Sequence, residues 1–597
     1  GLDGYPSLLG ANHNAAAALA IDGRIVAACE EERLTRVKFD GRFPRRAIAY
    51  CLKRAGLRGL DAVDLFCTSY SLPALFQQEI IERAAPGFDR VERAAISTFL
   101  RGMRAYNRIA GYDDARSLRV FERETGVRLE PRRFRVIPHH VCHVASAFYD
   151  APFDRALCVT LDGQGETDCG LVARMAGTDL EILSRTLVPN SLGYLYLFTT
   201  LLLGFQTHDE YRVMGLAPYG RRETYRSFFR SIIRLETDGR YVIDPKLMAQ
   251  LMATQLGFKG RLFPPRWRDG LGPQRRPGEP LEQRHMDIAA GLQEALEETV
   301  MHVLAHQRAV TGERNLCLAG GVALNSTLNG VIARSGLFDR LWVHPAAHDA
   351  GAAVGAALYG SYNVLCAPRT HVASHPCGLG PEYTDGDIDA ACREACVRAE
   401  RHGTDDLARV VAAALAEGEV VGWFQGRSEW GPRALGHRSI LADPRRADMK
   451  ERVNRAVKHR ESFRPFAPSC LAERADEWFD LRGLPDSPHM LFVVPVREAK
   501  RGLVPAVTHV DGSARVQTVT AVQDPRFHAL LKAFETLTGV PLLMNTSFNV
   551  QGEPIVESPS DALRCFLGTG IGVLVLGDVL VRKHDRPSEN ALDDGRA

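Results

Sequence analysis

Three features that would each point to a class of protein are missing from this sequence. The longest apolar stretch, YLYLFTTLLLGF at residues 194–205, is shorter than the roughly 18 residues of a membrane span, so it predicts a buried helix. The chain does not open with a charged-then-apolar leader, so we expect no export. The formal net charge is only +2, without the positive excess of a protein that binds long nucleic acid. We therefore expect a cytoplasmic protein with neither a membrane nor a nucleic-acid partner.

Paired cysteines are also missing. The 13 cysteines are scattered and no two form a CxxC pair, so the sequence predicts neither structural zinc nor a disulfide framework. Lysine is much rarer than arginine, which makes a lysine inside a motif more noticeable. The 597 residues are enough for two or three domains, each with its own core.

Strand-turn-strand patterns in the first half predict an α/β domain with internal duplication. Residues 8–32 read as a strand, a turn and two further strands around Asp22-Gly23, and residues 155–174 repeat this pattern. We expect a first domain over residues 1–365 and a connection leading into the second domain over 366–400. The second domain is expected over 401–597, starting with a helix at 405–417 and a strand at 420–426.

Glycine-rich turns follow apolar strands at three places in the first domain: residues 10–14, 161–166 and 318–325. Glycine lets backbone N–H groups approach phosphate oxygens closely, so together the turns predict a nucleotide site, whereas each alone reads as a tight turn. In this order they resemble the actin, hexokinase and Hsp70 superfamily, which has a duplicated ribonuclease-H-like fold. The residues expected to contact the nucleotide are Gly163, Gly165, Gly320, Gly321 and Asn325.

His139 and His143 are four residues apart, which on a helix places both imidazoles on one face, as a divalent metal needs. Asp162 and Asp349 are the expected carboxylate ligands, and such a mixed set suits Fe(II), Mn(II), Co(II) or Zn(II). The zinc-protease pattern fails because residue 140 is His and not Glu. The alternative is that the histidines are core residues and Asp349 is a helix N-cap.

The second domain concentrates basic residues in motifs that also contain Gly, Pro, Phe and Trp. Arginine offers a bidentate fork to phosphate oxygens and lysine a mobile charge, so these motifs predict a site for a triphosphate and a second phosphoryl substrate. The alternative is a solvated surface. The residues expected to bind are Arg433, Lys458, Arg464, Arg515, Ser547 and Asn545.

Eight motifs together resemble the O-carbamoyltransferases of bacterial natural-product and nodulation-factor biosynthesis, over essentially the whole chain. They are EEERLTRVKFDGRFP (30–44), HHVCHVASAFY (139–149), LDGQGE (161–166), DEYRVMGLAPYG (209–220), GGVALNS (320–326), WGPRALGHRSILADPR (430–445), VKHRESFRPFAPS (457–469) and NTSFNVQGEPIV (545–556). The resemblance implies a Kae1-like first domain and a YrdC-like second domain.

The resemblance also implies a reaction in two steps. The second domain would make carbamoyl-AMP from carbamoyl phosphate and Mg-ATP, with Arg433 and Lys458 as catalytic residues. The first would hold the adenylate at a divalent metal, iron in the family pattern, and transfer the carbamoyl group to a hydroxyl of a small-molecule natural product, as in antibiotic tailoring. His139, His143, Asp162 and Asp349 then look like metal ligands, and His13 like the general base.

Several alternatives remain open at the level of the sequence. Ala16, Phe39 and His348 depart from the common Ser, His and Gly of the family pattern. A threonylcarbamoyl-type transferase or kinase of the same superfamily would not need the second domain, and the hydrogenase-maturation carbamoyltransferase would need zinc-finger cysteines. A non-catalytic nucleotide-binding regulator is the alternative from another class. The acceptor is undetermined, with specificity expected in residues 70–119 and 228–284, and the protein is expected to be a monomer or homodimer.

Overall fold

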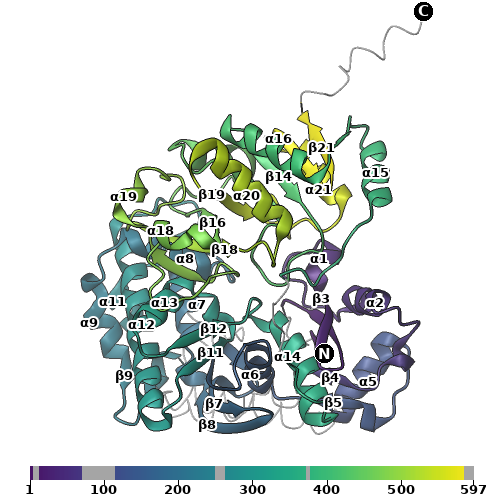
Figure 1. Ribbon diagram of the computed structural model, residues 1–597. Helices are drawn as coiled ribbons and strands as arrows, with labels where there is room; N and C mark the ends of the chain where they lie inside the picture. The colour runs from purple at the N-terminus through teal and green to yellow at the C-terminus, as the bar shows by residue number, and fades with distance from the viewer. Residues whose placement is uncertain (5–12, 70–113, 249–262, 371–376, 584–597) are drawn as a thin grey trace, which may run out of the picture. The chain divides into compact units, whose positions relative to one another are not determined.

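Two five-stranded sheets with the same strand arrangement organise the N-terminal part of the computed structural model, which describes residues 1–4, 13–69, 114–248, 263–370 and 377–583 (Figure 1). The first sheet has the order β3-β2-β1-β4-β5 and consists of β1 (Leu2–Asp3), β2 (Ala16–Ile21), β3 (Arg24–Glu30), β4 (Phe66–Thr68) and β5 (Phe134–Val136). The second has the order β12-β11-β6-β7-β8 and consists of β6 (Arg155–Gly165), β7 (Asp168–Ala176), β8 (Asp179–Leu187), β11 (Asn315–Ala319) and β12 (Arg340–Val343).

The strand directions of the two sheets also correspond. In the first sheet β1, β2 and β3 form an antiparallel meander, while β4 and β5 continue parallel to β1. In the second, β6, β7 and β8 form the meander, and β11 and β12 continue parallel to β6. The internal duplication expected from the strand patterns is therefore present, with β1 equivalent to β6. The strand expected around residues 8–10 lies outside the described residues.

Helices α6 (His139–Tyr149) and α14 (Asp349–Tyr359) pack against each other almost backbone to backbone. α14 is built from small residues, and a Cβ added to Gly355 would lie 1.8 Å from the carbonyl oxygen of Cys142 on α6. α6 is buried over its whole length. Because only glycine permits this approach, Gly355 sets the distance between the two helices that carry His139, His143 and Asp349.

Substituting Gly355 with alanine is expected to push α14 away from α6 and to lower the affinity for a divalent metal by about tenfold or more, the usual range for residues that support ligands. Metal titration followed by thermal unfolding would measure this. Gly59 is the matched control because a Cβ there meets nothing within 4 Å. If the Gly355 variant bound metal as tightly as the Gly59→Ala variant, this account of α14 would be wrong.

The remaining elements of the N-terminal part cover the sheets and form a small hairpin. The stretch expected to be a buried helix is α7, which has seven buried residues among its eleven. The elements of this part are α2 (Arg45–Arg54), α5 (Asp114–Thr125), α7 (Leu192–Leu202), α8 (Glu210–Leu216), α9 (Glu223–Ile232), β9 (Ile233–Leu235), β10 (Tyr241–Ile243), α11 (Pro265–Leu271), α12 (Gln283–Thr311) and α13 (Ser326–Arg334). Helix α1 (Glu31–Thr35) directly follows β3 but clusters with the C-terminal part from residue 32 on.

A nine-stranded mixed sheet forms the C-terminal part, in the order β13-β21-β20-β14-β15-β19-β16-β18-β17. Its central strands β14, β15, β16 and β20 are buried at every residue, as expected for a sheet covered on both faces. The strands are β13 (Glu400–Arg401), β14 (Val421–Phe424), β15 (Arg438–Ala442), β16 (Ala467–Leu471), β17 (Phe492–Pro495), β18 (Ser513–Val519), β19 (Leu542–Ser547), β20 (Val573–Leu576) and β21 (Val579–Arg582). The helices are α15 (Asp385–Glu394), α16 (Thr404–Ala416), α17 (Met449–Val453), α18 (Ala475–Trp478), α19 (Glu498–Arg501), α20 (Pro525–Thr538) and α21 (Pro559–Leu567).

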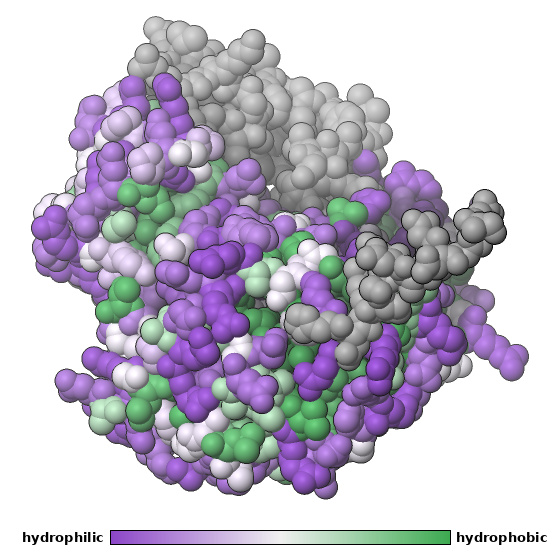
Figure 2. Space-filling view, turned by 90° about the horizontal axis from the view of Figure 1, so that it is seen from above, coloured by the Kyte–Doolittle hydropathy of each residue, from purple (hydrophilic) through white to green (hydrophobic). Residues whose placement is uncertain are grey.

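The chain divides into two units. Unit 1 comprises residues 1–31, 39–373 and 482–485, and unit 2 comprises residues 32–38, 374–481 and 486–597. Two short segments therefore belong to the unit formed mainly by the other half of the chain. On the face drawn in Figure 2, hydrophilic residues predominate and hydrophobic residues lie in small groups between them. Among the described residues, no helix is long and apolar enough to cross a membrane.

Candidate active site

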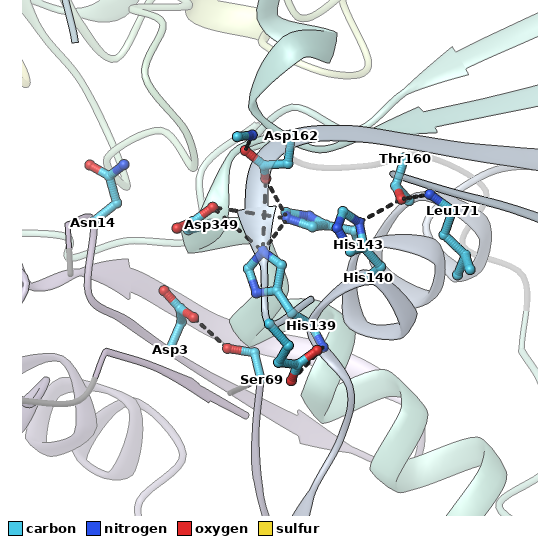
Figure 3. A network of polar contacts seen from close by, with 12 residues as sticks. Asp3, Asn14, Ser69, His139, His140, His143, Thr160, Asp162, Leu171 and Asp349 are labelled. Atoms are coloured by element: carbon cyan, nitrogen blue, oxygen red, sulfur yellow. Dashed lines mark hydrogen bonds and ion pairs between the residues drawn. The ribbon is translucent and has the colours of Figure 1, made fainter. Parts of the chain in front are cut away.

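Four side chains from three elements of unit 1 converge on one point (Figure 3). His139 and His143 lie on α6, Asp162 near the end of β6, and Asp349 at the first position of α14. One ligand atom from each lies within 4.8 Å of the others. Nε2 of His143 is 3.0 Å from Nε2 of His139 and 3.1 Å from Oδ2 of Asp162, and Oδ1 of Asp349 is 3.7 Å from Nε2 of His139.

The charges at this point favour a cation. Burial by itself lowers the pKa of His139, but Asp162 and Asp349 outweigh it and raise the pKa to about 9. The pKa of Asp162 is well below its usual range, because its contacts to both imidazoles outweigh burial. Burial and the neighbouring His139 lower the pKa of His143. Two imidazoles and two carboxylates that draw positive charge into a buried position are a suitable donor set for a divalent transition metal.

The start of α6 is fixed by Glu166, which the sequence analysis did not single out. The backbone N–H of His139 donates to the Glu166 carboxylate at 3.2 Å, so the LDGQGE turn satisfies the first turn of this helix. His140 turns away from the cluster, and its Nδ1 lies 2.8 Å from the hydroxyl of Thr160 (Figure 3). Burial lowers the pKa of His140 to about 3, so it is a neutral core histidine. Of the three histidines of this motif, the structure therefore leaves His139 and His143 as the candidate metal ligands.

Asp3 is a second buried acid beside the cluster that the sequence analysis missed. The hydroxyl of Ser69 donates a hydrogen bond to Oδ1 of Asp3. Burial together with the charge of Asp349 raises the pKa of Asp3 to about 8. Asp3 ends β1, and Asp162 lies near the end of the equivalent strand β6. The signal was the repeated tripeptide Leu-Asp-Gly, at residues 2–4 and 161–163.

His13 lies at the edge of this cluster and is partly exposed. Its Nδ1 is 3.8 Å from Oδ2 of Asp349 and 2.9 Å from the amide nitrogen of Asn14. Its ring packs edge-on against His208, with centroids 4.5 Å apart. Burial and the neighbouring His13 lower the pKa of His208 to about 4, so His208 is neutral. The structure therefore places His13 next to the proposed metal ligands.

The predicted glycines pack around Asp162 and His139. A Cβ on Gly165 would lie 2.3 Å from the His139 ring, and one on Gly320 would lie 2.3 Å from the carbonyl oxygen of Leu161. Gly163 donates its N–H to Asp162 at 2.6 Å, and a Cβ on Gly321 would be 3.1 Å from the same carboxylate. Gly165 and Gly320 are thus needed for the close packing of two turns at the cluster.

Asn325 has contacts within the protein that already account for it. Its side chain accepts the N–H of Leu328 and caps α13, and its amide exchanges two hydrogen bonds with Gln293. Of the turn expected at residues 10–14, only residues 13 and 14 are described.

Unit 2 holds the second cluster, centred on Lys458. This side chain is buried, and its Nζ donates to the carbonyl oxygen of Asn549 at 2.9 Å, to Oδ1 of Asn549 at 2.7 Å and to the Ser547 hydroxyl at 3.2 Å. It also donates to the Ser547 carbonyl. The lysine predicted from the motif is therefore held at a fixed position by the strand end and turn after β19.

Four arginines of unit 2 lie close enough to affect one another. Burial and Arg464 lower the pKa of Arg433 to about 10, and burial with Arg433, Arg460 and Arg464 lowers the pKa of Arg515. Among the described residues, no hydrogen-bond partner reaches the buried Nε of Arg515. Like charges gathered at one place require a counter-anion, so this arginine cluster is suited to bind phosphate. Arg460 was missed, although it stands in the same motif as Arg464.

Asn545 is buried behind the loop that carries Arg433. Its amide donates to the Ala434 carbonyl at 3.2 Å and to the Ser469 hydroxyl at 2.9 Å. The structure thus gives Asn545 contacts that hold the loop, and places Ser547 against Lys458.

Comparison with known proteins identifies the family of this chain. The family descriptions Carbamoyltransferase N-terminus and Carbamoyltransferase C-terminus match residues 8–358 and 412–583. The chain belongs to the carbamoyltransferase family and is a carbamoyltransferase, which confirms the resemblance seen in the motifs.

Among its relatives are two nodulation proteins. The chain is 42% identical to nodulation protein NolNO of Sinorhizobium fredii, over 97% of this chain and 80% of that protein. It is 46% identical to nodulation protein NolO of Bradyrhizobium diazoefficiens, over 74% of this chain and 78% of that protein. It is also 39% identical to the uncharacterized protein sll1178 of Synechocystis, over 96% of both. The solved structure of full-length HypF has 14% identity and a TM-score of 0.25, covering 39% of this chain and 43% of that chain, which is too weak to inform the fold.

Proposed function

We propose that this carbamoyltransferase works in two steps at two sites: unit 2 makes carbamoyl-AMP from carbamoyl phosphate and Mg-ATP, and unit 1 transfers the carbamoyl group to a hydroxyl. The observation that carries the proposal is the presence of two clusters of opposite character. One gathers Lys458 and four arginines in unit 2, and the other gathers two imidazoles and two carboxylates in unit 1.

The matching strand orders of the two N-terminal sheets support a duplicated ribonuclease-H-like fold of the Kae1-like kind for unit 1. In that arrangement Asp3 and Asp162 occupy equivalent strand ends, and the glycines beside Asp162 line the adenylate. The mixed sheet of unit 2 would be the YrdC-like part.

Transfer of a carbamoyl group to a hydroxyl requires a good leaving group on the carbamoyl carbon. Nitrogen donates into the carbonyl of a carbamoyl group, so a neutral hydroxyl attacks it slowly unless the group is activated as a mixed anhydride with AMP. In unit 2 the guanidinium groups of Arg433, Arg464 and Arg515 neutralise phosphate oxygens, and the ammonium of Lys458 is held where charge builds up. In this step water takes the phosphoryl group of carbamoyl phosphate, which gives phosphate and leaves carbamate. A carbamate oxygen then attacks the α-phosphorus of ATP and pyrophosphate leaves.

In unit 1, His139, His143, Asp162 and Asp349 would hold a divalent cation, with Fe(II) favoured by the family resemblance and Mn(II), Co(II) or Zn(II) compatible with the same donors. When bound, the cation supplies Lewis-acid stabilisation of negative charge on oxygen. Release of AMP completes the transfer.

His13 is the proposed base for the acceptor hydroxyl. Its Nδ1 faces the Asn14 amide at 2.9 Å, and the orientation of that amide sets the tautomer. In the structure the Asn14 amide nitrogen faces Nδ1 and donates to it, so Nδ1 is the acceptor and Nε2 carries the proton. Nε2 can take a proton from the hydroxyl once the amide turns over, so that its oxygen accepts the proton of Nδ1.

Release of pyrophosphate tests the proposal. We expect the enzyme to release pyrophosphate from Mg-ATP only when carbamoyl phosphate is present, and to form carbamoyl-AMP. A nucleotide-binding regulator would release none, and a threonylcarbamoyl-type transferase would require threonine and bicarbonate in place of carbamoyl phosphate. Screening hydroxylated natural products for a mass gain of one carbamoyl group would then identify the acceptor.

A further inference from the structure

A short segment from the N-terminal half of the chain is built into unit 2. Residues 32–38, called here the inserted segment, cluster with unit 2, whereas residues 1–31 and 39–373 belong to unit 1. The segment comes from the EEERLTRVKFDGRFP motif, which has no part in the reaction proposed above. It also lies outside the C-terminal family match at residues 412–583.

Arg33 of the inserted segment holds the loop that carries Arg433. Its side chain is buried, and Nη2 donates to the carbonyl oxygen of Gly431 at 2.9 Å. Gly431 has a φ of +102°, which favours glycine, so the direction of this carbonyl depends on the local backbone. The contact fixes the loop two residues before Arg433.

Glu429 holds the other end of the same loop. One carboxylate oxygen accepts the backbone N–H groups of Leu435 at 2.8 Å, His437 at 3.0 Å and Arg438 at 2.9 Å. Burial raises the pKa of Glu429, but the charges of His437 and Arg33 contribute to lowering it overall, which keeps the carboxylate ionised. Arg33 therefore supports the loop both by its own hydrogen bond and through Glu429.

Arg36 holds the second loop of the phosphate-binding site. Nη1 donates to the carbonyl oxygen of Ile555 at 2.6 Å, and Nη2 donates to that of Pro554 at 2.9 Å. These carbonyls lie at the end of the turn that begins with Asn549, whose Oδ1 accepts a hydrogen bond from Lys458. In the same turn the amide of Asn549 donates to the carbonyl oxygen of Glu553 at 2.7 Å. The guanidinium group of Arg36 thus holds the end of this turn by two hydrogen bonds from a segment distant in the sequence.

The contacts of Arg33 and Arg36 hold two different loops of the proposed phosphate site. Arg433 lies on one loop, and the oxygens that hold Lys458 lie at the start of the other. A loop is held in place by few contacts of its own, so one short segment whose two arginines bond to backbone carbonyls of the two loops fixes the loops relative to each other.

Resting on the adenylate-forming role proposed for unit 2, we propose that the inserted segment is a positioning element of that site, with Arg33 and Arg36 as positioning residues for Arg433 and Lys458. The segment holds the cationic groups in the geometry that carbamoyl phosphate and ATP require. The phosphate site of unit 2 is then incomplete without a piece of the N-terminal half of the chain.

The test uses the full-length enzyme and measures carbamoyl-phosphate-dependent pyrophosphate release at saturating Mg-ATP. The variants are Arg33→Ala, Arg33→Lys and Arg36→Ala. Arg497→Ala is the matched control, because Arg497 is also an arginine of unit 2 that donates to a backbone carbonyl, that of Asp476 at 2.6 Å. Arg497 is not part of the proposed site.

We expect kcat/KM for carbamoyl phosphate to fall about tenfold or more in the two alanine variants, the usual effect of losing a hydrogen bond from a charged group. Arg33→Lys should retain part of the activity because it can still donate to Gly431. Added guanidinium at millimolar concentration should restore activity to Arg33→Ala and leave Arg497→Ala unchanged, a response that a loss of folding would not produce.

The outcomes separate this inference from the function on which it rests. If the unsubstituted enzyme releases no pyrophosphate, the proposed function fails. If it does, and a folded Arg36→Ala variant stays within about twofold of Arg497→Ala, the inference is overturned. Should Arg33→Ala not fold, Arg36→Ala decides the matter, because Arg36 is less buried, with its side chain 24% exposed.

Discussion

Replacing Lys458 by methionine is expected to reduce carbamoyl-phosphate-dependent pyrophosphate release at least about a hundredfold, because a preorganised donor at a developing charge contributes about 3 to 4 kcal/mol to transition-state stabilisation. Methionine keeps most of the volume of the side chain and removes its charge. The four oxygen contacts of Nζ show that the ammonium is fixed before substrate binds, so its loss is not offset by a mobile neighbour.

The same variant should leave the second step intact. Given synthetic carbamoyl-AMP, it is expected to release AMP at the rate of the unsubstituted enzyme, since His139 and the other proposed ligands are unchanged. Lys532→Met is the matched control, because Lys532 is exposed on α20, where it pairs with Glu535, and it is not part of the proposed site. A folded Lys458→Met variant that lost both steps while still binding metal would contradict the division of the reaction between the two units.

The local patterns of this sequence predicted its elements better than its long-range contacts. The spacing of His139 and His143 predicted a helix with both imidazoles on one face, and α6 has this form. The spacing of the histidines could not predict that His140 lies outside the cluster, because its position depends on a contact with the hydroxyl of Thr160 on β6. Strand and helix patterns depend on neighbours in the chain, whereas burial of a particular histidine depends on which distant element packs against it.

The parts that were missed have the same cause. Asp3 lies in a strand of only two residues, so the Leu-Asp-Gly repeat was easily overlooked, and it is the pairing of β1 with β2 and β4 that makes Asp3 the counterpart of Asp162. The assignment of residues 32–38 to unit 2 leaves no mark in composition, since a short, mainly basic segment is equally typical of an exposed helix end. Asn545 and Asn325 stand in motifs, yet the structure shows that their side chains hold loops and helix ends.

The second large effect is expected from substituting a ligand of the proposed metal centre. His139→Gln is expected to lower AMP release from synthetic carbamoyl-AMP about a hundredfold or more and to reduce the bound metal, because it removes one of four donors and leaves Asp162 and Asp349 with a single imidazole. Pyrophosphate release by unit 2 should remain. Metal content measured by elemental analysis, together with the two half-reactions, tests this expectation.

His140→Gln is a closely matched control, since it makes the same chemical change at the next residue of the same buried helix. Glutamine can keep a hydrogen bond to Thr160, so this variant is expected to retain metal and transfer. Removing the metal with a chelator and then restoring Mg²⁺ should reproduce the His139 result in the unsubstituted enzyme: adenylate forms and transfer stops. Equal losses in the His139 and His140 variants would mean that α6 contributes packing alone, and retained transfer after metal removal would mean that the four side chains act without a cation.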